Sequence, residues 1–155
     1  MIIYRGFDPK VIKAVDFCNV LFNGSFGFYS KINEVDRFDM SDASPAEISK
    51  IYRDVWRIYS FEYVVYKPCW RWSKAIGYYS KSKPFIINVN YYKLKKMSKH
   101  QIVGNIAHEL GHAADHFSDK SFNHGNNSRL GKENTFQYFV GRLAKSISII
   151  VTGKL

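Results

Sequence analysis

Apolar residues recur at intervals of three and four along two stretches of the first 60 residues, the spacing of a helix with one buried face. The first stretch is 8–22, which opens on an aspartate suited to a helix N-cap. The second is 44–56, where Ser44, Pro45 and Glu47 form a capping box with a proline at the first helical position. Two helices are therefore predicted before any strand.

The next three stretches are short and rich in β-branched and aromatic residues, a composition typical of strands. They cover 61–67, 75–81 and 84–90. A short turn-like segment separates the last two, so we expect these two strands to form a hairpin.

A second capping box, made by Ser98 and Gln101, predicts a helix over 99–116. A polar stretch rich in Gly and Asn follows, and a last helix is predicted from about Lys132. This order of elements favours an α+β domain, with a small antiparallel or mixed sheet packed on the 99–116 helix. A length of 155 residues fits a single domain over 1–155.

Composition narrows the class of protein. Hydrophobic residues make up 46% of the chain and aromatic residues 17%, which suffices for a core and excludes a disordered chain. The two cysteines form no CxxC motif and no disulfide framework. No signal peptide and no apolar run of transmembrane length is present, so we expect a cytoplasmic protein without membrane contact. Export by a specialised route would leave no such signal, and a secreted peptidase is an alternative.

Positive charge is concentrated in one span. The net charge is +10, and residues 63–107 contain nine Lys and Arg residues but no Asp or Glu. Aromatic residues alternate with these charges, among them Trp70 and Trp72 on either side of Arg71. Such a surface suits nucleic acid, through phosphate contacts and base stacking. The alternative is a solvated basic face over a sheet whose aromatic residues form the core.

An HExxH motif, His108-Glu109-Leu110-Gly111-His112, lies inside the predicted 99–116 helix. One helical turn separates the two histidines, so both imidazoles project from one face about 6 Å apart along the axis. That separation allows both to bind one zinc ion, with Glu109 placed to take a proton from a zinc-bound water. The motif therefore predicts a zinc site.

A catalytic zinc needs a third protein ligand, and three residues compete for this position. His116 would lie about 12 Å along the helix axis from His108, too far to share one ion. His124 lies in a loop long enough to return to the helix, next to Gly125. Glu133 follows near the predicted last helix, where a favourable interaction with the helix dipole is another explanation for it. We favour His124 over Glu133.

The stretch 84–113, "PFIINVNYYKLKKMSKHQIVGNIAHELGHA", resembles the SprT-like group of zincin metallopeptidases. In that group a strand ending in an Asn-containing turn leads into the HExxH helix, and a downstream His-Gly pair, here His124-Gly125, supplies the third zinc ligand. "FNHG" and "NTFQYFVG" also look like elements of small phage-encoded zincins, with Gln137 in place of an expected proline. The resemblance covers 75–141 and leaves the first 60 residues uncovered.

The resemblance implies a zincin-like fold and a zinc-dependent endopeptidase acting on protein or peptide substrates. His108, His112 and His124 would be the zinc ligands, and Glu109 the general base and acid. An edge strand at Phe85–Val89 would pair with an extended substrate. The resemblance also points, less specifically, to Tyr138 as a hydroxyl donor to the oxyanion. It adds Asn88 and Asn90 as further candidate site residues. SprT-like proteases that act on DNA-attached proteins would also account for the basic span at 63–107. Neither specificity nor oligomeric state follows from the sequence.

Overall fold

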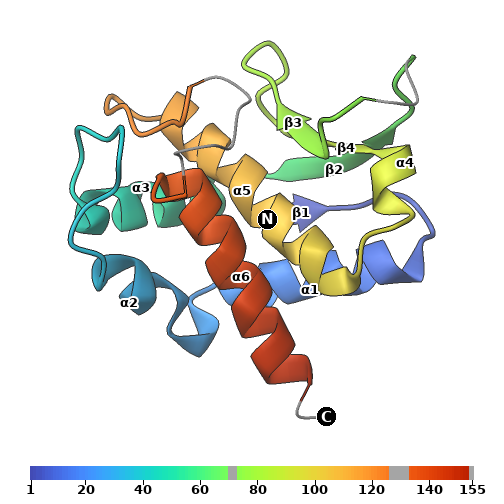
Figure 1. Cartoon of the computed structure of the whole chain (residues 1–155), viewed down its shortest axis with the longest axis horizontal. Coiled ribbons are helices and arrows are strands. Elements are labelled where there is room, and N and C mark those ends of the chain that lie inside the picture. Colours follow the sequence, from blue (N-terminus) through green and yellow to red (C-terminus); the bar gives the residue numbers. More distant parts are fainter. Residues whose placement is uncertain (70–72, 126–132, 154–155) are drawn as a thin grey trace.

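The computed structural model describes residues 1–69, 73–125 and 133–153 and shows an α+β fold (Figure 1). Within these residues it has six α-helices, a 3₁₀ turn at Ser25–Gly27 and one mixed four-stranded sheet. The helices are α1 (Pro9–Phe22), α2 (Phe28–Asn33), α3 (Pro45–Ile58), α4 (Tyr91–Leu94), α5 (Lys99–His116) and α6 (Phe136–Thr152). The strands are β1 (Ile2–Ile3), β2 (Phe61–Tyr66), β3 (Gly77–Tyr79) and β4 (Ile86–Asn90).

The strand order is β1-β2-β4-β3, with β1, β2 and β4 parallel and β3 antiparallel to β4. The predicted hairpin of the last two strands is confirmed. The predicted edge position of Phe85–Val89 is wrong, because β4 lies between β2 and β3. Its two asparagines are buried and hydrogen-bonded: Asn88 Nδ2 donates to the Tyr78 carbonyl, and Asn90 caps α4 at the Tyr92 N–H. β3 is an edge strand instead.

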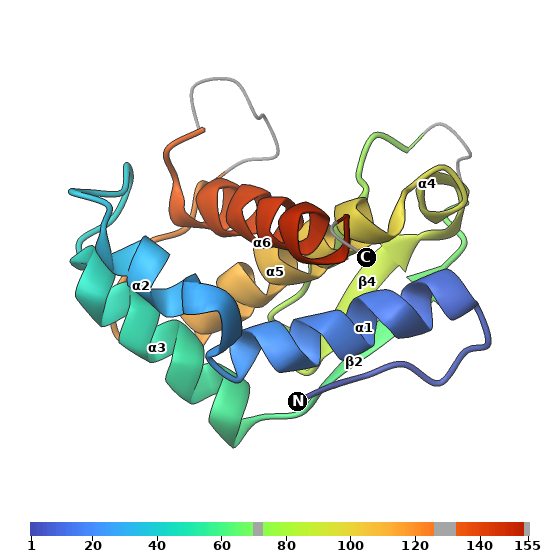
Figure 2. The ribbon, with the colours of Figure 1, turned by 90° about the horizontal axis from the view of Figure 1, so that it is seen from below.

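Helix α5 runs through the middle of the molecule, below the sheet in the view of Figure 1. Figure 2 shows α6 on one side of it and α1 with α3 on the other. The expected packing of this helix on the sheet is confirmed. Three sides of α5 are thus supported, and the remaining side faces the space between β3 and α6.

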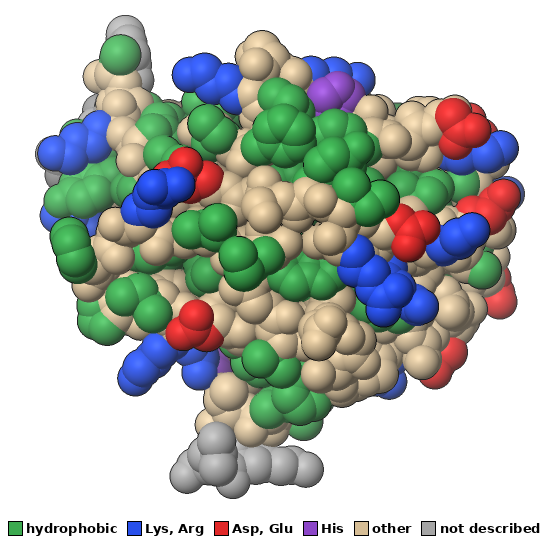
Figure 3. Space-filling model, turned by 180° about the vertical axis from the view of Figure 1, so that it is seen from behind, with side chains coloured by type: hydrophobic (Ala, Val, Ile, Leu, Met, Phe, Trp, Pro, Cys, Tyr) green, Lys and Arg blue, Asp and Glu red, His purple; other side chains and the backbone are tan. Residues whose placement is uncertain are grey.

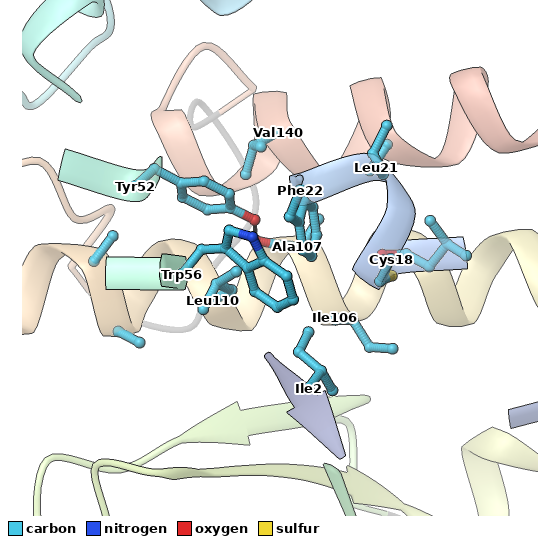
Figure 4. Close-up of a cluster of buried hydrophobic side chains, with 14 of the residues drawn as sticks. Ile2, Cys18, Leu21, Phe22, Tyr52, Trp56, Ile106, Ala107, Leu110 and Val140 are labelled. Carbon is cyan, nitrogen blue, oxygen red and sulfur yellow. Dashed lines mark hydrogen bonds between the residues drawn. The ribbon is translucent and has the colours of Figure 1, made fainter. Parts of the chain in front are cut away.

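The hydrophobic core packs between α5 and side chains of α1, α3 and α6. Figure 4 shows Tyr52 and Trp56 of α3 next to Phe22 of α1 and Ala107 of α5, with Val140 of α6 close by. All but Trp56 are fully buried, and the rings of Phe22 and Tyr52 meet edge to face at 5.6 Å. The Tyr52 hydroxyl donates a hydrogen bond of 3.2 Å to the Ala107 carbonyl. Burial of each such side chain stabilises the fold by about 1.5–3 kcal/mol, so this packing fixes α5 in place.

Two glycines bring α5 and α6 into backbone contact. A Cβ on Gly104 would lie 2.8 Å from the Gly141 carbonyl oxygen, and one on Gly141 would lie 2.9 Å from the Gly104 carbonyl oxygen. Real Cβ atoms are essentially never this close to another heavy atom, so only glycine fits at either position. This approach places α6 directly alongside the HExxH residues.

Helix boundaries follow the sequence closely, with one difference. Both predicted capping boxes form, at Ser44 with Glu47 and at Ser98 with Gln101. The last helix begins at Phe136, after a turn at 133–134, and not near Lys132, which lies outside the described residues. Among the described residues, no helix combines the length and apolarity that crossing a bilayer requires.

Candidate metal centre

His108 and His112 lie one turn apart on α5, with their ring centroids 5.0 Å apart. The helix positions them because it is capped at its start and packed on three sides. Both side chains line a cleft of about 830 Å³ whose floor is α5 and whose walls are β3 and α6. The predicted common face of the HExxH histidines is confirmed.

The loop after α5 folds back along the helix, and Asp115 holds it there. This buried carboxylate accepts hydrogen bonds from the Phe122 N–H at 2.8 Å and from Asn123 Nδ2 at 3.1 Å. Phe122 is fully buried against Phe136, which anchors the same stretch in the core. Gly125 then turns the chain with a positive φ of 72°, which glycine adopts without strain. These contacts direct His124 towards α5.

Three histidines therefore converge. One ring nitrogen from each of His108, His112 and His124 lies within 4.8 Å of the other two, and this group could hold a metal ion. The Nε2 atoms of His108 and His124 are 3.3 Å apart. His124 is only 4% exposed, and the other two are partly buried. The predicted grouping of His124 with the two motif histidines is confirmed.

The competing third ligands lie elsewhere. Nδ1 of His116 is 2.6 Å from the Tyr79 hydroxyl, and its ring stacks on Phe117. Glu133 is exposed in the turn before α6, where its backbone carbonyl accepts a hydrogen bond from Arg142. His100 contacts the Ser148 hydroxyl near the start of α5. Among the described residues, the triad is the only grouping of three or more His, Cys, Asp or Glu side chains with this geometry.

Burial favours the neutral imidazole, the form that binds metal, at the two triad histidines of α5. Burial lowers the pKa of His108 to about 4 and that of His112 to about 3. The Gln137 backbone on α6 opposes part of this lowering of the His108 pKa. Nε2 of His108 faces His124, so this is the ring nitrogen placed to share a metal ion with it.

Glu109 lies next to the triad, and its side chain is almost fully buried. Burial raises its pKa to about 8, opposed by hydrogen bonds from the Tyr79 backbone N–H and from Asn105 Nδ2. Asn105 in turn accepts a hydrogen bond from the Tyr63 hydroxyl at 3.1 Å. A carboxylate held by two donors at the floor of an open cleft is suited to exchange protons with a bound molecule.

Tyr138 of α6 closes the site on the opposite wall. Its ring centroid lies 4.8 Å from those of His108 and His124, and its side chain lines the cleft. Asn88 and Asn90, by contrast, do not line the cleft and serve the hairpin and the cap of α4.

Sequence reasoning missed Asn105 as the partner of Glu109 and the closeness of the Gln137 backbone to His108. Asn105 could have been found, because it precedes Glu109 by one helical turn and so shares its face. The Gln137 contact is between two helices and has no local signal. The basic span is described only in part: Trp70, Arg71 and Trp72 lie outside the described residues, while Lys67 and Lys95 lie over the Tyr91 ring.

No protein-family model, no curated protein and no solved structure matches this chain. What the cleft does must therefore be inferred from its own chemistry.

Proposed function

We propose that this chain is a zinc-dependent metalloendopeptidase with a zincin-like arrangement, and that it hydrolyses peptide bonds in protein or peptide substrates. The observation that carries this proposal is the convergence of three histidine nitrogens beside a buried carboxylate in an open cleft. Three protein ligands with one position left open is the pattern of catalytic zinc sites, whereas structural sites use four.

The donor set fits zinc. Neutral imidazole is a preferred zinc ligand, and burial favours the neutral form of both His108 and His112 by lowering their pKa values. Bound there, zinc would acidify a water molecule, polarise the substrate carbonyl and, by its charge, keep Glu109 ionised.

Glu109 is the proposed general base and acid. Its carboxylate would accept the proton of the attacking water and then donate it to the leaving amine. Asn105 and the Tyr79 N–H hold the carboxylate in place, which favours both transfers because a fixed donor geometry needs no rearrangement. Tyr138 is the proposed hydroxyl donor to the oxyanion, from the wall opposite β3.

The strand proposed to pair with the substrate is β3, in place of the Phe85–Val89 strand that the resemblance implied. It forms a wall of the cleft and has a paired neighbour, β4, on one side. The Ile76 carbonyl accepts a hydrogen bond from the Asn90 N–H of β4, and backbone groups alternate along a strand, so those of Gly77 face outward. An extended peptide can therefore add to this edge beside the histidines.

The test compares the wild-type chain with Glu109→Gln and with Glu133→Gln, a matched change at an exposed glutamate. Metal content is measured by elemental analysis, and cleavage is measured on a denatured proteome with and without chelator. We expect all three proteins to bind about one zinc per chain and only Glu109→Gln to lose cleavage. Undiminished cleavage by Glu109→Gln, or the absence of bound zinc from the wild type, would refute the proposal.

A further inference from the structure

Among the described residues that line the cleft, the exposed charged side chains are all positive. They are Lys74, Lys81, Arg142 and Lys145. The carboxylates in this described part of the lining are Glu109 and Asp115, both buried and both occupied by hydrogen bonds from the protein. On the face shown in Figure 3, by contrast, acidic and basic side chains are interspersed.

These cations are not neutralised by the chain itself. Within the described residues, the one ion pair is Arg5 with Glu62, away from the cleft. Arg142 donates to the backbone carbonyl of Glu133, a neutral group. A concave surface of one charge sign concentrates field lines and attracts ligands of the opposite sign.

Two of the four cations lie towards one end of the cleft. Lys145 is beside Gly104, one turn before His108. Lys74 precedes Gly77, which packs against Asn105. Arg142 reaches instead towards the start of α6, where it donates to the Glu133 carbonyl. At the other end, Lys81 follows Tyr79, whose hydroxyl bonds His116, and the buried Asp115 lies on the same side.

We infer that the cleft selects acidic peptides, with carboxylate side chains on one side of the scissile bond bound by Lys74 and Lys145. This inference rests on the proposed peptidase function and names its substrate class. A peptide fits better than nucleic acid, because the cleft that these cations line has the outer edge of β3 as one wall. That edge can hydrogen-bond an extended polypeptide backbone and offers no ladder of partners to a nucleic acid.

The experiment uses quenched fluorescent peptides that share one cleavable core. Three residues on one side of the core are either all Glu or all Gln, and a second pair of peptides carries the same change on the other side. The zinc-loaded chain is compared with the double variant Lys74→Gln/Lys145→Gln. The control is Lys31→Gln/Lys50→Gln, which removes the same charge from exposed positions outside the cleft. Binding of the same peptides to Glu109→Gln, followed by fluorescence anisotropy, gives a readout that needs no cleavage.

For one of the two sides of the core, we expect kcat/KM of the Glu peptide to exceed that of the matching Gln peptide by about tenfold at low salt. The difference should be smaller at high salt. The double variant should lose most of this ratio, and the control should keep it. Cleavage with equal rates on Glu and Gln peptides would overturn the inference and leave the peptidase proposal intact. If no peptide is cleaved, the proposed function fails. In that case the inference is tested by binding alone, and equal affinities of Glu109→Gln for the Glu and Gln peptides, measured by fluorescence anisotropy, would overturn it. Tighter cleft-dependent binding of a single-stranded oligonucleotide than of the acidic peptide would also overturn it.

Discussion

The Nε2 atoms of His108 and His124 lie 3.3 Å apart, although one residue is on α5 and the other is in the loop that follows it. Two nitrogens bound tetrahedrally to one zinc ion, each at about 2.0–2.1 Å, are separated by about 3.4 Å. The loop thus already brings His124 to the spacing that a shared ion requires. The predictions below test what creates this spacing and what it does.

His124→Ala should strip the zinc, as should His108→Ala, because each supplies one of three ligand nitrogens. His116→Ala and Glu133→Ala should keep it, since both residues lie outside the triad. Elemental analysis after dialysis against a weak chelator measures this. If Glu133→Ala loses zinc and His124→Ala retains it, the assignment of the third ligand is wrong.

Asp115→Ala should lower zinc affinity by about 10–100-fold although Asp115 is not a member of the triad. The carboxylate holds the Phe122–Asn123 stretch that directs His124 to the helix. Asp119→Ala is the control, because Asp119 is exposed. Competition with a zinc-sensing dye gives both affinities, and equal values for the two variants would show that the loop holds His124 without Asp115.

Asn105→Ala should lower kcat by about tenfold or more with little change in KM or zinc content, because Glu109 loses a positioning donor. The same change leaves the buried Tyr63 hydroxyl without its partner, at a cost of about 1–3 kcal/mol of stability. Tyr63→Phe separates the two effects, since it breaks that hydrogen bond and keeps the Asn105–Glu109 contact. A kcat loss of equal size in Tyr63→Phe would mean that Asn105 acts through the fold alone.

Tyr138→Phe should lower kcat by about 10²–10³-fold if the hydroxyl stabilises the oxyanion. The phenyl ring keeps the packing against His108 and His124, so zinc content should not change. Tyr78→Phe, at another tyrosine lining the cleft, is the matched control and should keep wild-type kcat. Steady-state kinetics on one peptide suffice, and a fully active Tyr138→Phe enzyme would rule out the hydroxyl role.

The metal-free protein should be most stable near pH 6.5. The pKa values of His108 and His112 fall from 6.5 to about 4 and about 3 on folding, so the unfolded chain binds more protons and stability falls as the pH drops below 6.5. The pKa of Glu109 rises from 4.5 to about 8, so the folded chain keeps a proton and stability falls as the pH rises towards 8. Between pH 4.5 and 6.5 the two histidines make the free energy of unfolding rise with pH and Glu109 makes it fall. The net effect is a rise, because there are two histidines and one glutamate.

Urea unfolding in chelator across this pH range measures the effect. Glu109→Gln should abolish the decline between pH 6.5 and 8 and steepen the rise between pH 4.5 and 6.5, since glutamine does not titrate and no longer opposes the two histidines. Parallel curves for wild type and variant above pH 6.5 would show that Glu109 does not retain a proton in the folded chain.

Patterns among residues close in the sequence predicted the residues of the candidate site more accurately than they predicted the strand order of the sheet. The bounds of α5 follow from its capping box and its apolar spacing, and the HExxH histidines share a face because the helix repeat requires it. The choice of His124 depended on a loop long enough to return and on Gly125, and both are readable in the sequence. The contact that holds this loop, Asp115 to Phe122, was not predicted, because it depends on where the loop packs.

The edge position of β4 was mispredicted because it came from the resemblance and not from the residues of the strand. The contacts of Asn88 and Asn90 with the Tyr78 carbonyl and the start of α4 also have no signal in the sequence. The two-residue strand β1 and the short helix α2 carry too little periodicity to be recognised alone. Strand order depends on long-range pairing, such as Glu62 with Ile86, for which no local pattern exists.

The backbone contact between Gly104 and Gly141 offers a way to recognise distant relatives where overall sequence comparison finds none. Any side chain at either position would push α6 away from α5 and carry Tyr138 away from the histidines. Glycines at these two places are thus expected to persist in diverged homologues together with HExxH. A search requiring a glycine four residues before the motif, a His-Gly pair after it and a glycine three residues after a tyrosine would be more selective than the pentapeptide alone. A homologue with a bulky residue at one glycine position, unchanged zinc binding and full activity would show that this pair is dispensable.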